Sequence, residues 1–332
     1  MSCLPRLSVL PLAMVLLAAS GCGGTHAPAR TSPAADSRGS LDHVASHAPA
    51  ALRLARITRL PAAVQLPAVA AEDGGALALG GLDTADASVA SMVLVDGTGA
   101  REVGQLPLAL HDAAAANVDG QVYFFGGGNA SRASAAILRV AGGTTHVAGQ
   151  LPVGASDIQA ATIGHTAYVV GGYTETIPLR TIVAFTPGRG ARIAGMLPRP
   201  LRYAAVAAVG GRLLIAGGTS GTAAQRAILS YDPATGSVHL LGLLPYPVTH
   251  AAGASLNGRF YVLGGRGESL TGQRAAMLEV DPLSGVVRSA GRLPQALSDL
   301  GVASLAGRIL LVGGRDTSGT VQDQALTLVP AQ

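Results

Sequence analysis

Apolar and polar positions along this chain repeat with a period of 45 to 49 residues. Each repeat contains a run of small apolar residues, a two-residue turn, and a strongly apolar stretch that ends on two adjacent glycines, as in NGRFYVLGGR at 257–266. A polar loop, a third apolar stretch, a further turn and a fourth stretch follow. Short apolar runs bounded by turn residues are typical of β-strands. The pattern therefore predicts four short strands in each repeat.

Two landmarks define the register of the repeats. A Leu-Pro pair opens each copy, and the first of the two glycines, here called the double glycine, follows that Leu by 20 residues in all six copies. Length varies only between the double glycine and the next Leu-Pro, so insertions belong to one class of loop. Four-strand units repeated at this period are the signature of a β-propeller. The copies open at Leu60, Leu106, Leu151, Leu197, Leu244 and Leu293.

At these residues the chain resembles the kelch repeat family. The match consists of the double glycine ending the second strand, the motifs Tyr231–Pro233 and Asp281–Pro282 ending the third, and the Leu-Pro pair leading into the next blade. It extends over about residues 52–332. The Trp usual in the fourth strand of that family is absent, as is the Arg four residues after the Leu of Leu-Pro. The resemblance implies an all-β, six-bladed, kelch-type β-propeller.

The two ends of the domain are expected to meet in one blade. The last copy has a first, a second and a third strand, the third being DQALTLVP at 323–330, and lacks a fourth. The segment ALRLARITRLP at 51–61 has the same relation to a Leu-Pro pair as the fourth strands elsewhere. We therefore predict that this N-terminal strand completes the last blade and closes the ring, which removes two exposed sheet edges.

The first residues indicate export from a bacterial cell. Arg6 precedes an apolar run too short to span a bilayer as a permanent helix, and small residues lead to Cys22, so residues 1–21 are expected to be a signal peptide. The ending AASGC resembles the lipobox of bacterial lipoproteins, although Ala19 stands where Leu is more common. This resemblance implies lipidation of Cys22 and anchoring on the extracytoplasmic side of a membrane. An unmodified signal peptide with a chance Cys is the alternative.

Residues 22–50 are expected to join the lipidated Cys to the propeller, which is assigned to residues 51–332. The joining segment is small, polar and rich in Pro, with no sustained apolar period, as is typical of a tether. Hydrophobic residues make up 48% of the chain, which is ample for a core. All 23 basic residues are Arg and lie dispersed among acids, whereas nucleic-acid binders concentrate such charge, so no nucleic-acid partner is expected.

The candidate site lies where the inner strands begin. The longer polar loops open on this face, which favours binding there. Six residues after each Leu of Leu-Pro, five of the six copies have a polar residue, and these side chains should converge on one axis. With two residues from the preceding position, the candidate binding ring comprises His111, Asp112, Asp157, Arg202, Tyr203, His250 and Asp299.

Other interpretations of this ring remain open at this stage. Polar residues at the mouth of a propeller channel can simply order water and cap backbone groups. A metal cluster of aspartates and histidines is conceivable, but these residues come from separate blades without the spacing of metal ligands. We therefore expect neither a metal nor another cofactor.

Two classes of function are compatible with the sequence. The first is a lipid-anchored extracytoplasmic binding module that presents its loops to a protein or glycan partner and contacts the membrane only through its lipid. The second comes from the resemblance, because exported kelch propellers of bacteria include sugar mutarotases and copper-radical oxidases. The oxidase cofactor needs a Cys, which the domain lacks. A mutarotase or epimerase could use His250 with Asp299 or Asp157 as a proton acceptor and donor, with Arg202 holding a substrate carboxylate.

Overall fold

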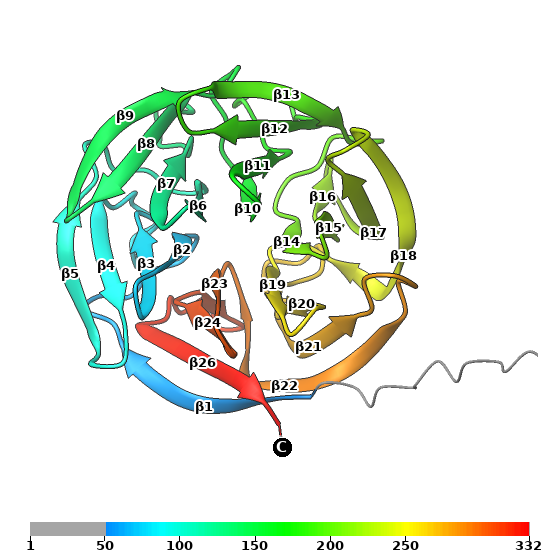
Figure 1. Cartoon of the computed structure of the whole chain (residues 1–332). Helices are drawn as coiled ribbons and strands as arrows, with labels where there is room; N and C mark the ends of the chain where they lie inside the picture. The colour runs from blue at the N-terminus through cyan, green and yellow to red at the C-terminus, as the bar shows by residue number, and fades with distance from the viewer. Residues whose placement is uncertain (1–50, 332) are drawn as a thin grey trace, which may run out of the picture. The chain divides into compact units, whose positions relative to one another are not determined.

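The computed structural model describes residues 51–331, and these residues form β-strands joined by turns and loops. Six sheets stand in a ring around a central axis (Figure 1). The predicted all-β fold with six blades is confirmed. The expected signal peptide, Cys22 and the expected tether lie outside the described residues. Within the described part of the chain, no helix has the length and apolar character needed to cross a bilayer.

The first three blades each contain four strands in sequence order from the axis outward. Blade 1 contains β2 (Ala68–Glu72), β3 (Gly75–Leu79), β4 (Ser91–Val95) and β5 (Ala100–Gln105). Blade 2 contains β6 (Ala114–Val118), β7 (Gln121–Phe125), β8 (Ala136–Ala141) and β9 (Thr144–Gln150). Blade 3 contains β10 (Gln159–Ile163), β11 (Thr166–Val170), β12 (Thr181–Thr186) and β13 (Gly190–Met196).

The other three blades follow the same plan, with two short additional strands. Blade 4 contains β14 (Ala205–Val209), β15 (Arg212–Ala216), β17 (Ala223–Asp232) and β18 (Ser237–Val248), and β16 (Thr219–Ser220) pairs with β17. Blade 5 contains β19 (Ala252–Leu256), β20 (Arg259–Leu263), β21 (Arg274–Val280) and β22 (Val287–Ser298). Blade 6 contains β23 (Gly301–Leu305), β24 (Arg308–Val312), β26 (Gln324–Pro330) and β1 (Leu52–Arg59), and β25 (Arg315–Asp316) pairs with the end of β22.

The ring closes as the sequence predicts. Strand β1 is antiparallel to β26, with a register from Leu52 opposite Pro330 to Arg59 opposite Gln324 and one irregularity after Leu54. Figure 1 shows the two strands side by side, one from each end of the domain. All six sheets are therefore built from residues 52–330, and this segment contains every strand pairing that the fold uses.

The hydrophobic core is divided among the spaces between adjacent blades. Six clusters of buried side chains fill these spaces, and each draws residues from two neighbouring sheets. Phe185 of blade 3, for example, lies edge-on to Phe125 of blade 2, with ring centroids 5.6 Å apart. Each blade therefore depends on both of its neighbours for burial.

The double glycines lie where adjacent blades approach each other closely. Gly171 has a φ of 64°, and a Cβ at this residue would lie 2.1 Å from the carbonyl oxygen of Leu201 in the next blade. Gly172 has a φ of 111° and donates its N–H to that same carbonyl over 2.9 Å. Only glycine satisfies both the left-handed backbone and the close contact. This is the physical reason for the repeat that the sequence displays.

Candidate binding site at the loop face

The predicted ring residues occupy one unusual backbone position. We call the face on which the inner strands begin the loop face, and the six residues just before these strands the ring positions. All six have a φ between 52° and 61°, the left-handed region that side chains other than Asn, Asp and His rarely adopt. The six are Leu66, Asp112, Asp157, Tyr203, His250 and Asp299.

Hydrogen bonds between blades hold this backbone. The N–H of His250 donates to the carbonyl of Tyr203 over 3.1 Å, and the N–H of Asp299 donates to the carbonyl of His250 over 3.1 Å. The N–H of Leu66 then donates to the carbonyl of Asp299 over 2.8 Å. Aspartate and histidine are enriched in this left-handed conformation, whereas a tyrosine such as Tyr203 is uncommon there. Tyr203 makes side-chain contacts with other ring residues.

The residue after each double glycine forms a second layer above the ring. It pairs with the residue just before the ring position of the same blade, as Thr219 does with Arg202 and Arg266 with Thr249. Arg315 pairs in the same way with Ser298. Sequence reasoning missed Arg266 and Arg315 as site residues. The signal was present, because both follow the Leu of Leu-Pro by the same 22 residues.

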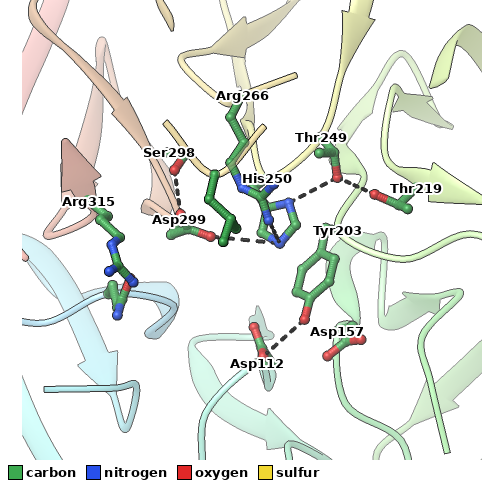
Figure 2. A network of polar contacts seen from close by, with 12 residues as sticks. Asp112, Asp157, Tyr203, Thr219, Thr249, His250, Arg266, Ser298, Asp299 and Arg315 are labelled. Atoms are coloured by element: carbon green, nitrogen blue, oxygen red, sulfur yellow. Dashed lines mark hydrogen bonds and ion pairs between the residues drawn. The ribbon is translucent and has the colours of Figure 1, made fainter. Parts of the chain in front are cut away.

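His250 is held by contacts on both ring nitrogens (Figure 2). The guanidinium of Arg266 has only protons to donate, so its Nη2 donates to Nε2 of His250 over 3.2 Å. Nδ1 of His250 then carries the proton and donates to Oγ1 of Thr249 over 3.0 Å. The imidazole also stacks on the ring of Tyr203, with centroids 3.7 Å apart. Burial, followed by the charges of Arg266 and Arg202, places the pKa of His250 well below its ordinary value.

This depressed pKa predicts a pH dependence of stability. His250 binds a proton near pH 6.5 in the unfolded chain and only at lower pH in the folded one. Its contribution to the stability of the fold is therefore present above about pH 6.5 and is lost as the pH falls. We expect the free energy of unfolding of the wild type to fall between pH 7 and 5 by up to about 1.4 kcal/mol per pH unit more than that of His250→Asn. Asn tolerates the left-handed backbone and does not titrate. Urea unfolding at several pH values measures the difference, and parallel pH profiles would contradict the prediction.

Tyr203 links His250 to the acidic side of the ring. Its hydroxyl donates to Oδ2 of Asp112 over 3.3 Å. Burial raises the pKa of Asp112 well above its ordinary value, and the nearby charges of Asp157 and Asp299 raise it further. Burial also raises the pKa of Asp299, whose carboxylate accepts a hydrogen bond from the hydroxyl of Ser298. Asp112 is thus the ring carboxyl that most favours its neutral, protonated form.

Arg202 and His111 lie at the outer edge of the ring. Nε of Arg202 forms an ion pair with Oδ2 of Asp157, and its guanidinium carbon lies 4.2 Å from the ring centre of Tyr173. Nδ1 of His111 lies 2.9 Å from the hydroxyl of Ser88, and its Nε2 lies 3.7 Å from Oδ2 of Asp112. Burial lowers the pKa of His111. All seven residues of the predicted binding ring therefore lie close together in the structure.

The ring does not form an open channel mouth. The side chains of Asp157, His250 and Asp299 are only 3%, 8% and 8% exposed, so they fill the axis at the loop face.

A cavity of about 250 Å³ lies along the inner strands, lined by residues from Pro67 beside the ring to Asn117 farther along the axis. The side chain of Arg202 is 27% exposed and that of Arg315 is 36% exposed. A ligand approaching the loop face would meet arginines before the ring carboxyls.

The described residues contain no group of three or more His, Cys, Asp and Glu side chains arranged to hold a metal ion. The side chains at the loop face offer several kinds of chemistry. They include cationic guanidinium groups, a neutral imidazole and a carboxyl that favours its protonated form. Such a set can bind an anion and can also exchange protons with a ligand.

The comparisons with known proteins define the fold and leave the ligand open. No family model matches the sequence, and no curated protein matches it. Among solved structures, that of YjhT is similar, with a TM-score of 0.69 and 16% sequence identity. The match covers 81% of this chain and 96% of that one. At this identity the likeness shows a shared propeller fold, and a fold alone does not establish a function.

Proposed function

We propose that this protein is an exported binding module, anchored to the extracytoplasmic side of a bacterial membrane through a lipid on Cys22. Its loop face takes an acidic group of a protein or glycan partner. The export signal and the AASGC motif support the location. The longer polar loops that open around the ring support a partner at this face.

The observation that carries the proposal is the pair of guanidinium groups at the loop face, where Arg266 and Arg315 both lie near Asp299. Arg266 forms no ion pair with a described residue and donates to an imidazole that is neutral at pH 7. Arg315 lies on the other side of Asp299 in Figure 2 and forms a long ion pair of 3.5 Å with the exposed Asp86. Burial, followed by the charges of Asp157 and Asp299, raises the pKa of Asp112 and so disfavours its charged form. Guanidinium groups bind carboxylates and phosphates with paired hydrogen bonds.

Binding of sugar acids tests the proposal. Residues 51–332 would be titrated calorimetrically with a series of sugar acids and with the neutral sugars of the same series. We expect the acids to bind, and Arg266→Gln to weaken their binding about tenfold, as loss of a charged hydrogen bond predicts. Arg308→Gln is the control, because Arg308 donates to the carbonyl of Gly74 in the turns opposite the loop face. Equal affinity for acids and neutral sugars, or an equal effect of the two substitutions, would contradict an anion site.

A sugar mutarotase or epimerase is a second candidate. One observation favours it: Tyr203 connects a neutral imidazole with a carboxyl that tends to hold its proton, and such a pair can accept and donate protons on a sugar ring. Binding is ranked first because His250 lies buried beneath Arg266, so catalysis would require the ring side chains to separate.

Anomer exchange distinguishes the two candidates. For the enzyme, we expect added protein to accelerate interconversion of the anomers of a bound sugar, and His250→Asn to abolish the acceleration while the fold is retained. A binding module would leave the interconversion rate unchanged and would tolerate His250→Asn. Nuclear magnetic resonance exchange spectroscopy measures the rate, and unchanged rates across the sugars that bind would eliminate the enzyme.

A further inference from the structure

The outermost strands of the blades share a repeated surface position. We call the residue four before the Leu of each Leu-Pro pair the rim position. In blades 2, 3 and 4 it is a large apolar residue, and these three side chains are 77%, 52% and 65% exposed. In the other three blades it is polar or charged. In the order of blades 1 to 6, the rim residues are Glu102, Val147, Ile193, Leu240, Ser289 and Arg56.

The apolar rim continues toward the loop face in blades 3 and 4. The residue just before Leu-Pro is Met196 in β13 and Leu243 in β18, and these side chains are 45% and 51% exposed. The same position is Gln105 in blade 1 and Arg292 in blade 5. Three neighbouring blades therefore carry exposed apolar side chains where the opposite half of the ring carries polar or charged ones. We call this surface the apolar rim.

Unpaired arginines lie along β13, the central strand of the apolar rim. Blade 3 has four exposed arginines along and beside β13, and none of them forms an ion pair with a described residue. Between Asp157 and Asp232 the chain has seven arginines and one acidic residue, Glu175, and two of the seven arginines form ion pairs with these flanking aspartates. The four are Arg180, Arg189, Arg192 and Arg199.

We propose that the apolar rim, centred on β13, binds the surface of a bilayer that contains anionic phospholipid. Exposed aliphatic side chains flanked by cationic ones are the features that hold peripheral proteins at such a surface, the former entering the headgroup region and the latter pairing with phosphates. Five exposed large apolar side chains on the outer strands of three neighbouring blades otherwise carry a cost in solubility. This inference concerns a different surface from the loop face and does not depend on lipidation of Cys22.

The shape of the rim favours a bilayer over a protein partner. The strands β9, β13 and β18 follow the outer curve of the ring (Figure 1). A convex surface buries little area against a rigid protein, and a specific protein interface needs about 1,000 Å² or more. A fluid bilayer adapts to such a surface, so Ile193 and Met196 can enter the headgroup region without a matching groove. This contact would leave the loop face beside the membrane and free for its own partner.

Vesicle binding by residues 51–332 tests this inference, since this segment contains every strand pairing of the fold. We expect cosedimentation with vesicles of phosphatidylglycerol and phosphatidylcholine in equal amounts and much weaker binding to pure phosphatidylcholine. Ile193→Asp should weaken binding about tenfold, because it removes apolar contact and adds a repelled charge. Arg192→Gln should weaken it about fivefold, the effect of one arginine near an anionic surface.

Blade 5 supplies matched controls. Ser289 and Arg288 of β22 occupy the same strand positions as Ile193 and Arg192 of β13. Ser289→Asp and Arg288→Gln make the same kinds of change outside the apolar rim and should leave vesicle binding unchanged. Equal effects in the two blades, or equal binding to the two kinds of vesicle, would overturn the proposal. Absence of binding to either vesicle would also overturn it, and an acidic protein surface would then be the partner to test.

Discussion

A chain that begins at Pro61, and so lacks β1, should not form a stable propeller at 25 °C. The deletion removes the whole register between Leu52 and Arg59, leaving β26 as an open edge. It also removes Leu52, which is buried between blades 5 and 6. A domain is stabilised by only about 5 to 15 kcal/mol in total, and losing a strand together with part of the core removes most of that. Gel filtration and thermal unfolding by circular dichroism measure the outcome.

A chain that begins at Ala51 is the control for this deletion. It keeps β1 and differs from the full chain only by residues outside the described segment. We expect a single cooperative unfolding transition, as for the full chain. If the chain starting at Pro61 unfolded cooperatively at the same temperature, the closing strand would not stabilise the ring.

Gly171→Ala should lower the free energy of unfolding by about 3 to 5 kcal/mol. The new Cβ would lie 2.1 Å from the carbonyl oxygen of Leu201, which is backbone of the next blade and accepts the N–H of Gly172. The contact can be relieved only by moving two blades apart, and the left-handed φ of 64° adds about 1 to 2 kcal/mol of strain. Urea unfolding at pH 7 measures the change.

Gly188→Ala separates the two causes of destabilisation, which are the close contact and the left-handed backbone. Gly188 has a φ of 76° in the turn between β12 and β13, and a Cβ there would have no atom within 4 Å. This substitution carries the left-handed strain without the contact, so we expect a loss of about 1 kcal/mol. Equal losses at Gly171 and Gly188 would mean that the double glycine serves the backbone conformation alone and not the approach of neighbouring blades.

The fold could be read from the sequence because its determinants are local and repeated. The constant interval between Leu-Pro and the double glycine reflects one inner hairpin that recurs in each blade, with turns such as Asn257-Gly258, where φ values of 50° and 73° match a tight hairpin. Closure by the N-terminal strand followed from counting strands. The convergence of Asp112, His250 and Asp299 followed from their shared place in the repeat.

The backbone conformation and the protonation of the candidate site could not be predicted from local, repeated patterns. The left-handed backbone at the ring positions arises from hydrogen bonds between blades, and no local signal marks Tyr203 or His250 for such a conformation. Arg266 determines which nitrogen of His250 carries the proton, although 16 residues separate them. The raised pKa of Asp112 results from burial and from charges contributed by blades 3 and 6.

The properties of the molecular surface were also predictable from the sequence only in part. From the sequence alone the arginines are interpreted as dispersed among acidic residues, and the predicted fourth strands contain Val147 and Ile193. Only the structure decided that these side chains are exposed on one side of the ring, because exposure depends on which strand is outermost and on what packs against it. Repeat architecture is thus determined by sequence, since each repeat encodes the same local geometry. Protonation, burial and surface character are determined by tertiary structure, since they arise where different repeats meet or fail to meet.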